Sequence, residues 1–321
     1  MPSALEQLKT HTMVVADTGD FSLLEKYKPQ DSTTNPSLIL AASKMPAYEH
    51  LVSKAIEYGK ANGETLDEKV ENAIDMMAVL FGLEILKIVP GRVSTEIDAG
   101  LSFDTEGTLN RARRLISLYE KEGINVKERL LLKIASTWEG LQAAKQLESE
   151  GYHCNLTLLF HLCQAAVAAE IGATLISPFA GRITDFYKQK QGISGFKVEE
   201  DPGVLSVKSI YNYYKVHGYK TIVMGASFRT KEQVLELAGC DALTISPMLL
   251  EELKEDHSDV QAKLSAASAA TEHAKMQLTE KQFRWMLNQD EMATLKLSEG
   301  IRKFHEDTEK LREAVRAKLQ A

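Results

Sequence analysis

Short runs rich in β-branched and apolar residues alternate with longer helical patterns along this chain, and this alternation restricts the fold more than any other feature. The runs lie at residues 13–18, 31–36, 92–98, 129–136, 153–160, 173–179, 220–227 and 241–247. Several intervening segments end in glycine, as helices commonly do. Eight strand–helix units within 321 residues favour a closed (β/α)8 TIM barrel of α/β class. An open, doubly wound parallel sheet is the alternative.

Composition and length are those of a large globular domain. Apolar residues make up 44% of the chain and charged residues 26%, which is enough apolar material for a barrel core. We predict one domain over residues 1–321, with a helical C-terminal portion at 248–321 that packs on the barrel. Apolar Phe283, Trp285 and Met292 favour that packing, although the mixed charge of the last stretch is equally typical of a solvated surface helix.

Charge and cysteine content argue against several classes of protein. The net charge is −7 without a basic block, so we expect no nucleic-acid partner. No apolar run has the length of a membrane span, so we expect no membrane association. The cysteines, Cys154, Cys163 and Cys240, are odd in number and form no CxxC pair, which indicates neither a disulfide framework nor a cysteine zinc site. With no recognisable secretory leader, this predicts a reducing, cytoplasmic location.

Polar residues stand at the ends of the predicted strands, where barrel enzymes carry out their chemistry. Seven of the eight strands contribute at least one, and the set is Asp17, Thr33, Thr34, Asn35, Glu96, Lys133, Asn155, Thr157, Ser177, Ser227 and Arg229. Each has an ordinary explanation by itself, since Asp17 could be a turn residue and Asn35 a helix N-cap. Strands of a parallel barrel, however, are covered on both faces and should be apolar. The whole set therefore predicts a site in the mouth of the barrel.

Lys133 lies within the apolar run LLLKIAS, which is an unusual place for an ammonium group. It could extend its charged end to water, as many lysines do. Alternatively, burial disfavours the charged form, and the neutral amine attacks a carbonyl group to form a Schiff base. That chemistry needs a general acid and base, and Glu96 and Asp17 are the two acids in the set. With the other strand-end residues present, we favour the Schiff base.

Two arginines indicate a phosphate group in the ligand. Arg182 ends the loop SPFAGR and Arg229 ends GASFR, and both follow predicted strands on the same side of the barrel. A guanidinium group binds phosphate through two parallel hydrogen bonds. These loops follow the sixth and seventh strands, whereas barrel phosphate sites usually use the loops after the seventh and eighth.

Two long segments, DSTTNPSLI (31–39) and LLLKIASTWEGLQAAK (130–145), resemble the signature segments of the transaldolase family, and shorter motifs extend the resemblance over essentially the whole chain. The resemblance implies a class I aldolase-type barrel of the pentose phosphate pathway. Such an enzyme moves a dihydroxyacetone unit from sedoheptulose 7-phosphate to glyceraldehyde 3-phosphate and gives erythrose 4-phosphate and fructose 6-phosphate. The resemblance also implies sugar-phosphate substrates, a homodimer, and no metal or organic cofactor.

The resemblance assigns roles to individual residues. It implies that Lys133 forms the Schiff base, that Glu96 relays protons through a water held by Thr157, and that Asp17 accepts the hydroxyl proton that drives carbon–carbon cleavage. The expected substrate-binding residues are Thr33, Asn35, Asn155, Ser177, Phe179, Arg182, Ser227 and Arg229, the last three at the phosphate. Phe179 matches transaldolases, whereas the related fructose 6-phosphate aldolases have tyrosine there, and this favours transfer over release to water.

One position departs from the family. In STEIDAGLSFD the family usually has arginine where this chain has Gly100. Glycine removes a charge and frees the backbone near Glu96, so it either loosens that loop or is a tolerated substitution. Two other functions stay open. One is an aldolase that releases free dihydroxyacetone, which Phe179 argues against. The other is a barrel that binds metabolites without catalysis, which the intact Lys133, Glu96 and Asp17 argue against.

Overall fold

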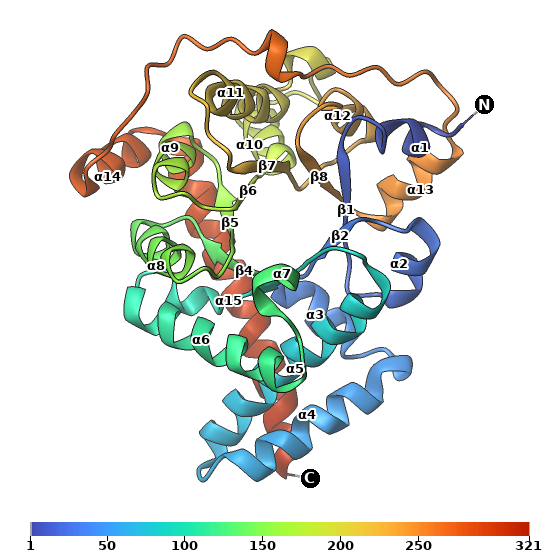
Figure 1. The fold of residues 1–321 in the computed structure, drawn as a ribbon, viewed down its shortest axis with the longest axis vertical. Helices are drawn as coiled ribbons and strands as arrows, with labels where there is room; N and C mark the ends of the chain where they lie inside the picture. The colour runs from blue at the N-terminus through green and yellow to red at the C-terminus, as the bar shows by residue number, and fades with distance from the viewer. Residues whose placement is uncertain (1, 321) are drawn as a thin grey trace.

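A computed structural model describes residues 2–320 and contains a closed barrel of parallel strands surrounded by helices (Figure 1). The strands pair in chain order, and the first strand closes the barrel against the last. Their bounds are β1 Met13–Asp17, β2 Asp31–Thr33, β3 Val93–Glu96, β4 Leu130–Ala135, β5 Cys154–Leu159, β6 Leu175–Pro178, β7 Ile222–Gly225 and β8 Ala242–Ile245. Each strand lies within one of the eight runs in the sequence. Because β1 pairs with β8 and the sheet closes, the (β/α)8 barrel is confirmed and the open sheet is wrong.

Helices connect the strands and cover the outside of the barrel (Figure 1). The helices up to β8 are α1 Ala4–Leu8, α2 Phe21–Tyr27, α3 Pro36–Ala42, α4 Glu49–Asn62, α5 Leu66–Ile88, α6 Thr105–Lys121, α7 Val126–Arg129, α8 Trp138–Ser149, α9 Leu162–Glu170, α10 Ala180–Gln191, α11 Pro202–Val216 and α12 Lys231–Leu235, with short 3-10 turns at η1 Pro46–Tyr48, η2 Ala99–Leu101 and η3 Val198–Glu200. The connection between β2 and β3 is unusually long because it carries α3, α4 and α5.

Local sequence signals explain where strands pass into helices. Asn35 caps α3, because its Oδ1 accepts a hydrogen bond from the backbone N–H of Leu38 at 3.0 Å. Thr137 caps α8 in the same way through the N–H of Gly140, also at 3.0 Å. Gly123, just beyond α6, has a φ of +81°, a backbone angle that residues other than glycine rarely adopt. These caps fix the points at which the chain turns at each end of the barrel.

The barrel interior is built in layers. A small apolar cluster lies inside the barrel, and each of five strands contributes one residue to it: Val15, Leu131, Leu175, Met224 and Ala242. Residues two positions further along a strand point to the same face. In four of those strands these residues are polar, and they are Asp17, Lys133, Ser177 and Thr244. The layer that follows the apolar plug is therefore polar, at the carboxyl ends of the strands.

The C-terminal portion differs from the prediction of continuous helix over 248–321. Helix α13 Pro247–Glu255 is followed by an irregular segment that contains only the short turn η4 Ala266–Ser268, and helix resumes at α14 Glu280–Gln289 and α15 Glu291–Gln320. The irregular segment, orange in Figure 1, is bound to the barrel by contacts such as the hydrogen bond from Met276 N–H to the Tyr213 hydroxyl at 2.8 Å. Its serine- and alanine-rich sequence has no periodic apolar face that a helix could bury.

Helix α15 crosses the barrel rather than projecting into solvent (red in Figure 1). It contacts β5, η2, α3, α4, α5 and α10 and buries nine of its residues, so the reading of a solvated surface helix is wrong. In the preceding part of the tail Phe283 is buried, whereas Trp285 is 60% exposed. Between residues 2 and 320, none of the helices combines the length and the apolar content that crossing a membrane requires.

Candidate active site

A cavity of about 390 Å³ opens at the carboxyl ends of the strands, beneath α15. Nine of the twelve residues expected at the site line it, and they are Asp17, Thr33, Asn35, Lys133, Ser177, Phe179, Arg182, Ser227 and Arg229. Glu96, Asn155 and Thr157 are outside this lining, although the first two contact residues within it. Within the described part of the chain, no three histidine, cysteine, aspartate or glutamate side chains are grouped as a metal site would require.

Lys133 and Glu96 form a buried ion pair at the centre of the site. They are partners in the β3–β4 register, which brings Lys133 Nζ to 3.0 Å from Glu96 Oε2. Their side chains are only 6% and 5% exposed. Lys133 Nζ also donates to the backbone carbonyl of Thr34 at 3.2 Å. Lys133 therefore does not extend to water, and its partner is a carboxylate that can exchange a proton with it.

The environment of Glu96 shifts its pKa. Burial raises the pKa of this carboxyl group above its ordinary value, and the nearby charge of Asp17 adds to that effect. The positive charges of Lys133 and Arg182 oppose the rise without cancelling it. A raised pKa brings a carboxyl group closer to the range in which it both donates and accepts a proton during catalysis.

Asp17 is held by a threonine on the neighbouring strand β2. Asp17 and Thr33 are partners in the β1–β2 register, and the Thr33 hydroxyl lies 2.9 Å from Asp17 Oδ1. Thr33 Oγ1 also lies 3.0 Å from Thr244 Oγ1 of β8. Asp17 is thus a strand residue facing the cavity, and the turn-residue explanation is wrong. Thr244 adds the eighth strand to the polar layer, a residue that the sequence analysis missed although it lies two positions after an inward-facing alanine.

A second group of polar side chains lies on β3, β5 and β6. Ser177 donates its hydroxyl hydrogen bond to Asn155 Oδ1 at 2.6 Å, and Asn155 Nδ2 donates to Ser94 Oγ at 3.1 Å. Asn155 and Thr157 are both fully buried, so neither alternates outward from a half-buried strand. Within residues 2–320 the Thr157 hydroxyl oxygen has no hydrogen-bond partner, which leaves it free to bind a small polar molecule.

The two arginines lie together beside the cavity, after β6 and β7 as the sequence indicated. Burial lowers the pKa of Arg182 below its ordinary value, and the charge of Arg229 adds to the effect. Arg229 Nη2 and Nε lie 2.8 and 2.9 Å from Asp185 Oδ2 on α10, and its Nη1 donates to the Ser227 carbonyl at 3.0 Å. Two guanidinium groups that line one cavity favour an anion there.

Helix α15 supplies site residues that the sequence analysis did not identify. Lys303, Phe304 and Asp307 line the cavity, and the Ser37 hydroxyl donates to Asp307 Oδ2. The Phe304 ring centre lies 5.9 Å from Lys133 Nζ and 5.3 Å from the Arg182 guanidinium carbon. No local pattern separates these side chains from the surface residues of an amphipathic helix, because only the docking of α15 brings them to the barrel.

Fold and site together define a (β/α)8-barrel enzyme whose centre is a buried lysine–glutamate pair beside two arginines. Comparison with known proteins specifies it further. A family model described as Transaldolase/Fructose-6-phosphate aldolase matches residues 14–315. The chain belongs to this family, and it is a transferase.

Several named relatives match over nearly their whole length. A transaldolase from Bos taurus is 57% identical over 99% of this chain and 95% of its own length. A probable transaldolase from Dictyostelium discoideum is 58% identical over 99% of this chain and 100% of its own length. A transaldolase from Homo sapiens is 58% identical over 97% of this chain and 93% of its own length.

Proposed function

We propose that this enzyme transfers a dihydroxyacetone unit from sedoheptulose 7-phosphate to glyceraldehyde 3-phosphate, giving erythrose 4-phosphate and fructose 6-phosphate, through a Schiff base on Lys133. The observation that carries the proposal is the buried contact of 3.0 Å between Lys133 Nζ and Glu96, next to a cavity with two arginines. The names of the relatives support the transfer reaction. The paired arginines support a phosphorylated substrate.

The reaction begins with a proton transfer and an addition. Lys133 transfers a proton to Glu96, and its neutral nitrogen attacks the ketone carbon of the donor sugar. A proton then moves from that nitrogen to the former ketone oxygen, which gives a neutral carbinolamine. Glu96 donates a proton to the leaving hydroxyl group, so that water departs and an iminium ion remains. The raised pKa of Glu96 suits this step, because a higher pKa makes the protonated form, which acts as the acid, more available. The Thr157 hydroxyl, which has no partner among the described residues, is suited to holding the water.

Cleavage and transfer follow from the iminium ion. Asp17 takes the proton from the C4 hydroxyl of the donor, and the electrons of the C3–C4 bond move to the iminium nitrogen. The aldose phosphate leaves, and an enamine of dihydroxyacetone stays on Lys133. The enamine carbon attacks the acceptor aldehyde, whose oxygen regains the proton from Asp17. Hydrolysis of the new iminium ion releases the ketose phosphate and restores the amine.

Reductive trapping tests the Schiff base. The enzyme is incubated with fructose 6-phosphate and borohydride and then digested, and the added mass is located by mass spectrometry. We expect a dihydroxyacetone adduct on the peptide that carries Lys133, and none in Lys133→Ala. The exposed Lys145→Ala on α8 is the matched control and should trap normally. A folded native protein with an unmodified Lys133 would exclude the mechanism.

The fate of the three-carbon unit is a separate measurement. Incubation with fructose 6-phosphate, with and without an acceptor aldehyde, is followed by an assay for free dihydroxyacetone. We expect release to be slow compared with transfer, because Phe179 occupies the position where related aldolases have tyrosine. Rapid release without acceptor would make the enzyme a hydrolytic aldolase instead.

The resemblance also supports a cytoplasmic homodimer in which the whole chain forms one domain. Light scattering of the purified protein tests the dimer, because a monomeric mass at micromolar concentration would contradict it. A single cooperative unfolding transition is expected of one domain.

A further inference from the structure

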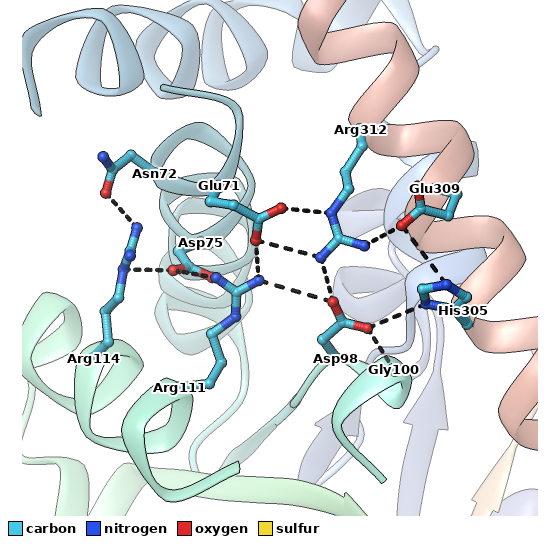
Figure 2. Close-up of polar contacts among 10 residues, drawn as sticks. All are labelled: Glu71, Asn72, Asp75, Asp98, Gly100, Arg111, Arg114, His305, Glu309 and Arg312. Atoms are coloured by element: carbon cyan, nitrogen blue, oxygen red, sulfur yellow. Dashed lines mark hydrogen bonds and ion pairs between the residues drawn. The ribbon is translucent and has the colours of Figure 1, made fainter. Parts of the chain in front are cut away.

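A network of charged side chains lies near Glu96 and involves none of the residues assigned to the reaction. Figure 2 shows that it joins α5, α6, α15 and the segment after β3. We call it the Asp98 network, and its members are Glu71, Asp75, Asp98, Arg111 and Arg312. Arg312 of α15 bridges two carboxylates, because its Nη2 pairs with Asp98 Oδ2 and its Nε lies 2.6 Å from Glu71 Oε1.

The Asp98 network is largely shielded from water. The side chains of Asp98, Arg111 and Arg312 are 9%, 13% and 16% exposed. Burial alone would raise the pKa of Asp98, yet Arg312, the N–H of Gly100 and Arg111 hold it below its ordinary value. Removal of one partner from a buried ion pair leaves an uncompensated charge, so each member depends on the others.

The network connects the catalytic strand to the helix over the cavity. Asp98 follows Glu96 by two residues at the end of β3. Arg312 follows Phe304 by eight residues on the same helix, a distance of about 12 Å along its axis. A second, smaller cavity of about 60 Å³ is lined by Glu96 and also by Asp98 and Arg111. The network thus reaches the surroundings of the catalytic pair from one side and holds α15 on the other.

Gly100 leaves the space beside Asp98 to side chains of α15. The family that this chain resembles usually has arginine there, whereas here the Gly100 N–H donates to Asp98 Oδ1 at 2.8 Å. A Cβ atom at Gly100 would lie 3.0 Å from His305 Nδ1 and 3.2 Å from Asp98 Oδ1. A side chain from this position would therefore lie against Asp98, where His305 of α15 now packs at 3.7 Å. Arg312 reaches the other carboxylate oxygen.

We propose that Arg312 is a positioning residue, which supplies from α15 the guanidinium group that an arginine at position 100 would bring to Asp98. Through Asp98 and Glu71 it fixes α15, with Lys303 and Phe304, against the strand end that carries Glu96. The inference rests on the proposed function for its kinetic readout, whereas its structural readout does not depend on it.

The test compares Arg312→Gln with a matched control on the same helix. Arg316→Gln removes a guanidinium group one turn further on, whose partner is the exposed Asp67. We expect Arg312→Gln to lower kcat by roughly tenfold and to raise KM severalfold, because displaced catalytic groups react slowly. Hydrogen exchange of backbone amides at 300–308 should become roughly tenfold faster. The control should leave kcat, KM and hydrogen exchange unchanged. Lys133 should still be trapped by borohydride in both variants.

Rescue distinguishes positioning from general stability. In the triple variant Gly100→Arg, His305→Ala and Arg312→Gln, the arginine at position 100 supplies the guanidinium group to Asp98. This variant should restore kcat and KM to within about threefold of native, since the new ion pair compensates for the lost one. A double-mutant cycle is completed by the single variant Asp98→Asn and by the double variant that also carries Arg312→Gln. The two changes should not be additive in kcat/KM or in hydrogen exchange.

Three results would overturn the proposal. They are native kinetics and exchange in Arg312→Gln, additivity in the Asp98 cycle, and a folded rescue variant that stays as slow as Arg312→Gln. If the rescue variant does not fold, the cycle decides. If Lys133 of the native enzyme is not trapped, the proposed function fails, and hydrogen exchange alone still tests the Asp98 network.

Discussion

At the scale of single residues, the site depends on ionisable groups that are buried away from water. Glu96 is the clearest case, because burial raises its pKa while Lys133 and Arg182 lower it. Glu96→Gln keeps the shape of the side chain but cannot transfer a proton. We expect kcat to fall by about 10²–10⁴-fold, the usual contribution of a general acid or base. The measurement is kcat for the transfer reaction at fixed pH.

The pH dependence of kcat gives a second view of the same group. As the acid, Glu96 must be protonated, so native kcat should fall as pH rises through its raised pKa. Glu96→Gln should lack that limb. Glu122→Gln, an exposed residue at the end of α6, should keep the native profile. A native limb retained in Glu96→Gln would assign the limb to another group.

Thr33 positions Asp17 through one hydrogen bond of 2.9 Å. Thr33→Val has nearly the same shape but cannot donate, which leaves the Asp17 carboxylate without this partner. Because a hydrogen bond to a charged group contributes about 1.5–3 kcal/mol, we expect kcat/KM to fall by roughly ten- to a hundredfold. Thr33→Ser retains the hydroxyl and should stay close to native. Equal activity in the valine and serine variants would contradict this role.

Gly181 permits two loops of the site to approach closely. A Cβ atom there would lie 2.0 Å from the Ser227 carbonyl oxygen and 3.0 Å from Arg229 Cγ. Gly181→Ala should therefore separate the loops that carry the arginines, cost about 1–3 kcal/mol of stability, and raise KM for sugar phosphates. Gly195→Ala is the control, since no atom lies within 4 Å of a Cβ there. Unchanged KM in Gly181→Ala would show that the loops can shift without loss of binding.

At the scale of elements, α15 forms one wall of the cavity through Phe304, which is 3% exposed. Phe304→Ala removes a large buried ring and should cost about 3–5 kcal/mol of unfolding free energy. It should also lower kcat, because Lys133 and Arg182 lose the ring beside them. Urea unfolding and steady-state kinetics measure the two effects. Leu295→Ala, at an exposed position of the same helix, should change neither.

Elements differed in how well the sequence predicted them. Every strand was identified because parallel barrel strands are short, apolar and bounded by caps, which are local signals. The length of the connection between β2 and β3, which carries α3, α4 and α5, was not predicted. The irregular segment before α14 lies within the portion predicted as helical, because its flanks are helical. Its path depends on contacts with Tyr213 and Ala238, which are distant in sequence.

At the scale of the whole molecule, stability should vary with pH through Asp75. Its side chain is 4% exposed, and burial raises its pKa from 3.8 to about 6 despite Arg111 and Arg114. Because the folded state binds this proton more tightly than the unfolded state, ionised Asp75 destabilises the fold by about 3 kcal/mol above pH 6. That cost decreases as pH falls from 6 toward 4.

Other carboxylates act in the opposite direction at lower pH. Glu71 and Asp98 have lowered pKa values, so their stabilisation is present above their ordinary pKa and is lost as pH falls below about 4. Urea titrations at several pH values should therefore give the Asp75 contribution as a gain between pH 7.5 and 5. Asp75→Asn should lack this gain, because its amide side chain does not titrate. If Asp75→Asn keeps the native dependence of unfolding free energy on pH, the gain comes from another group.

The sequence by itself determined the barrel, the order of its strands and the polar residues at their ends. Those features follow from the period-2 pattern of strands and from caps, which depend on neighbouring residues. The tertiary structure alone decided that α15 lies over the cavity and that Arg312 pairs with Asp98, 214 residues away in the chain. Such contacts depend on the path of the whole chain, because a charged side chain on an amphipathic helix has the same local sequence whether it faces water or a buried carboxylate.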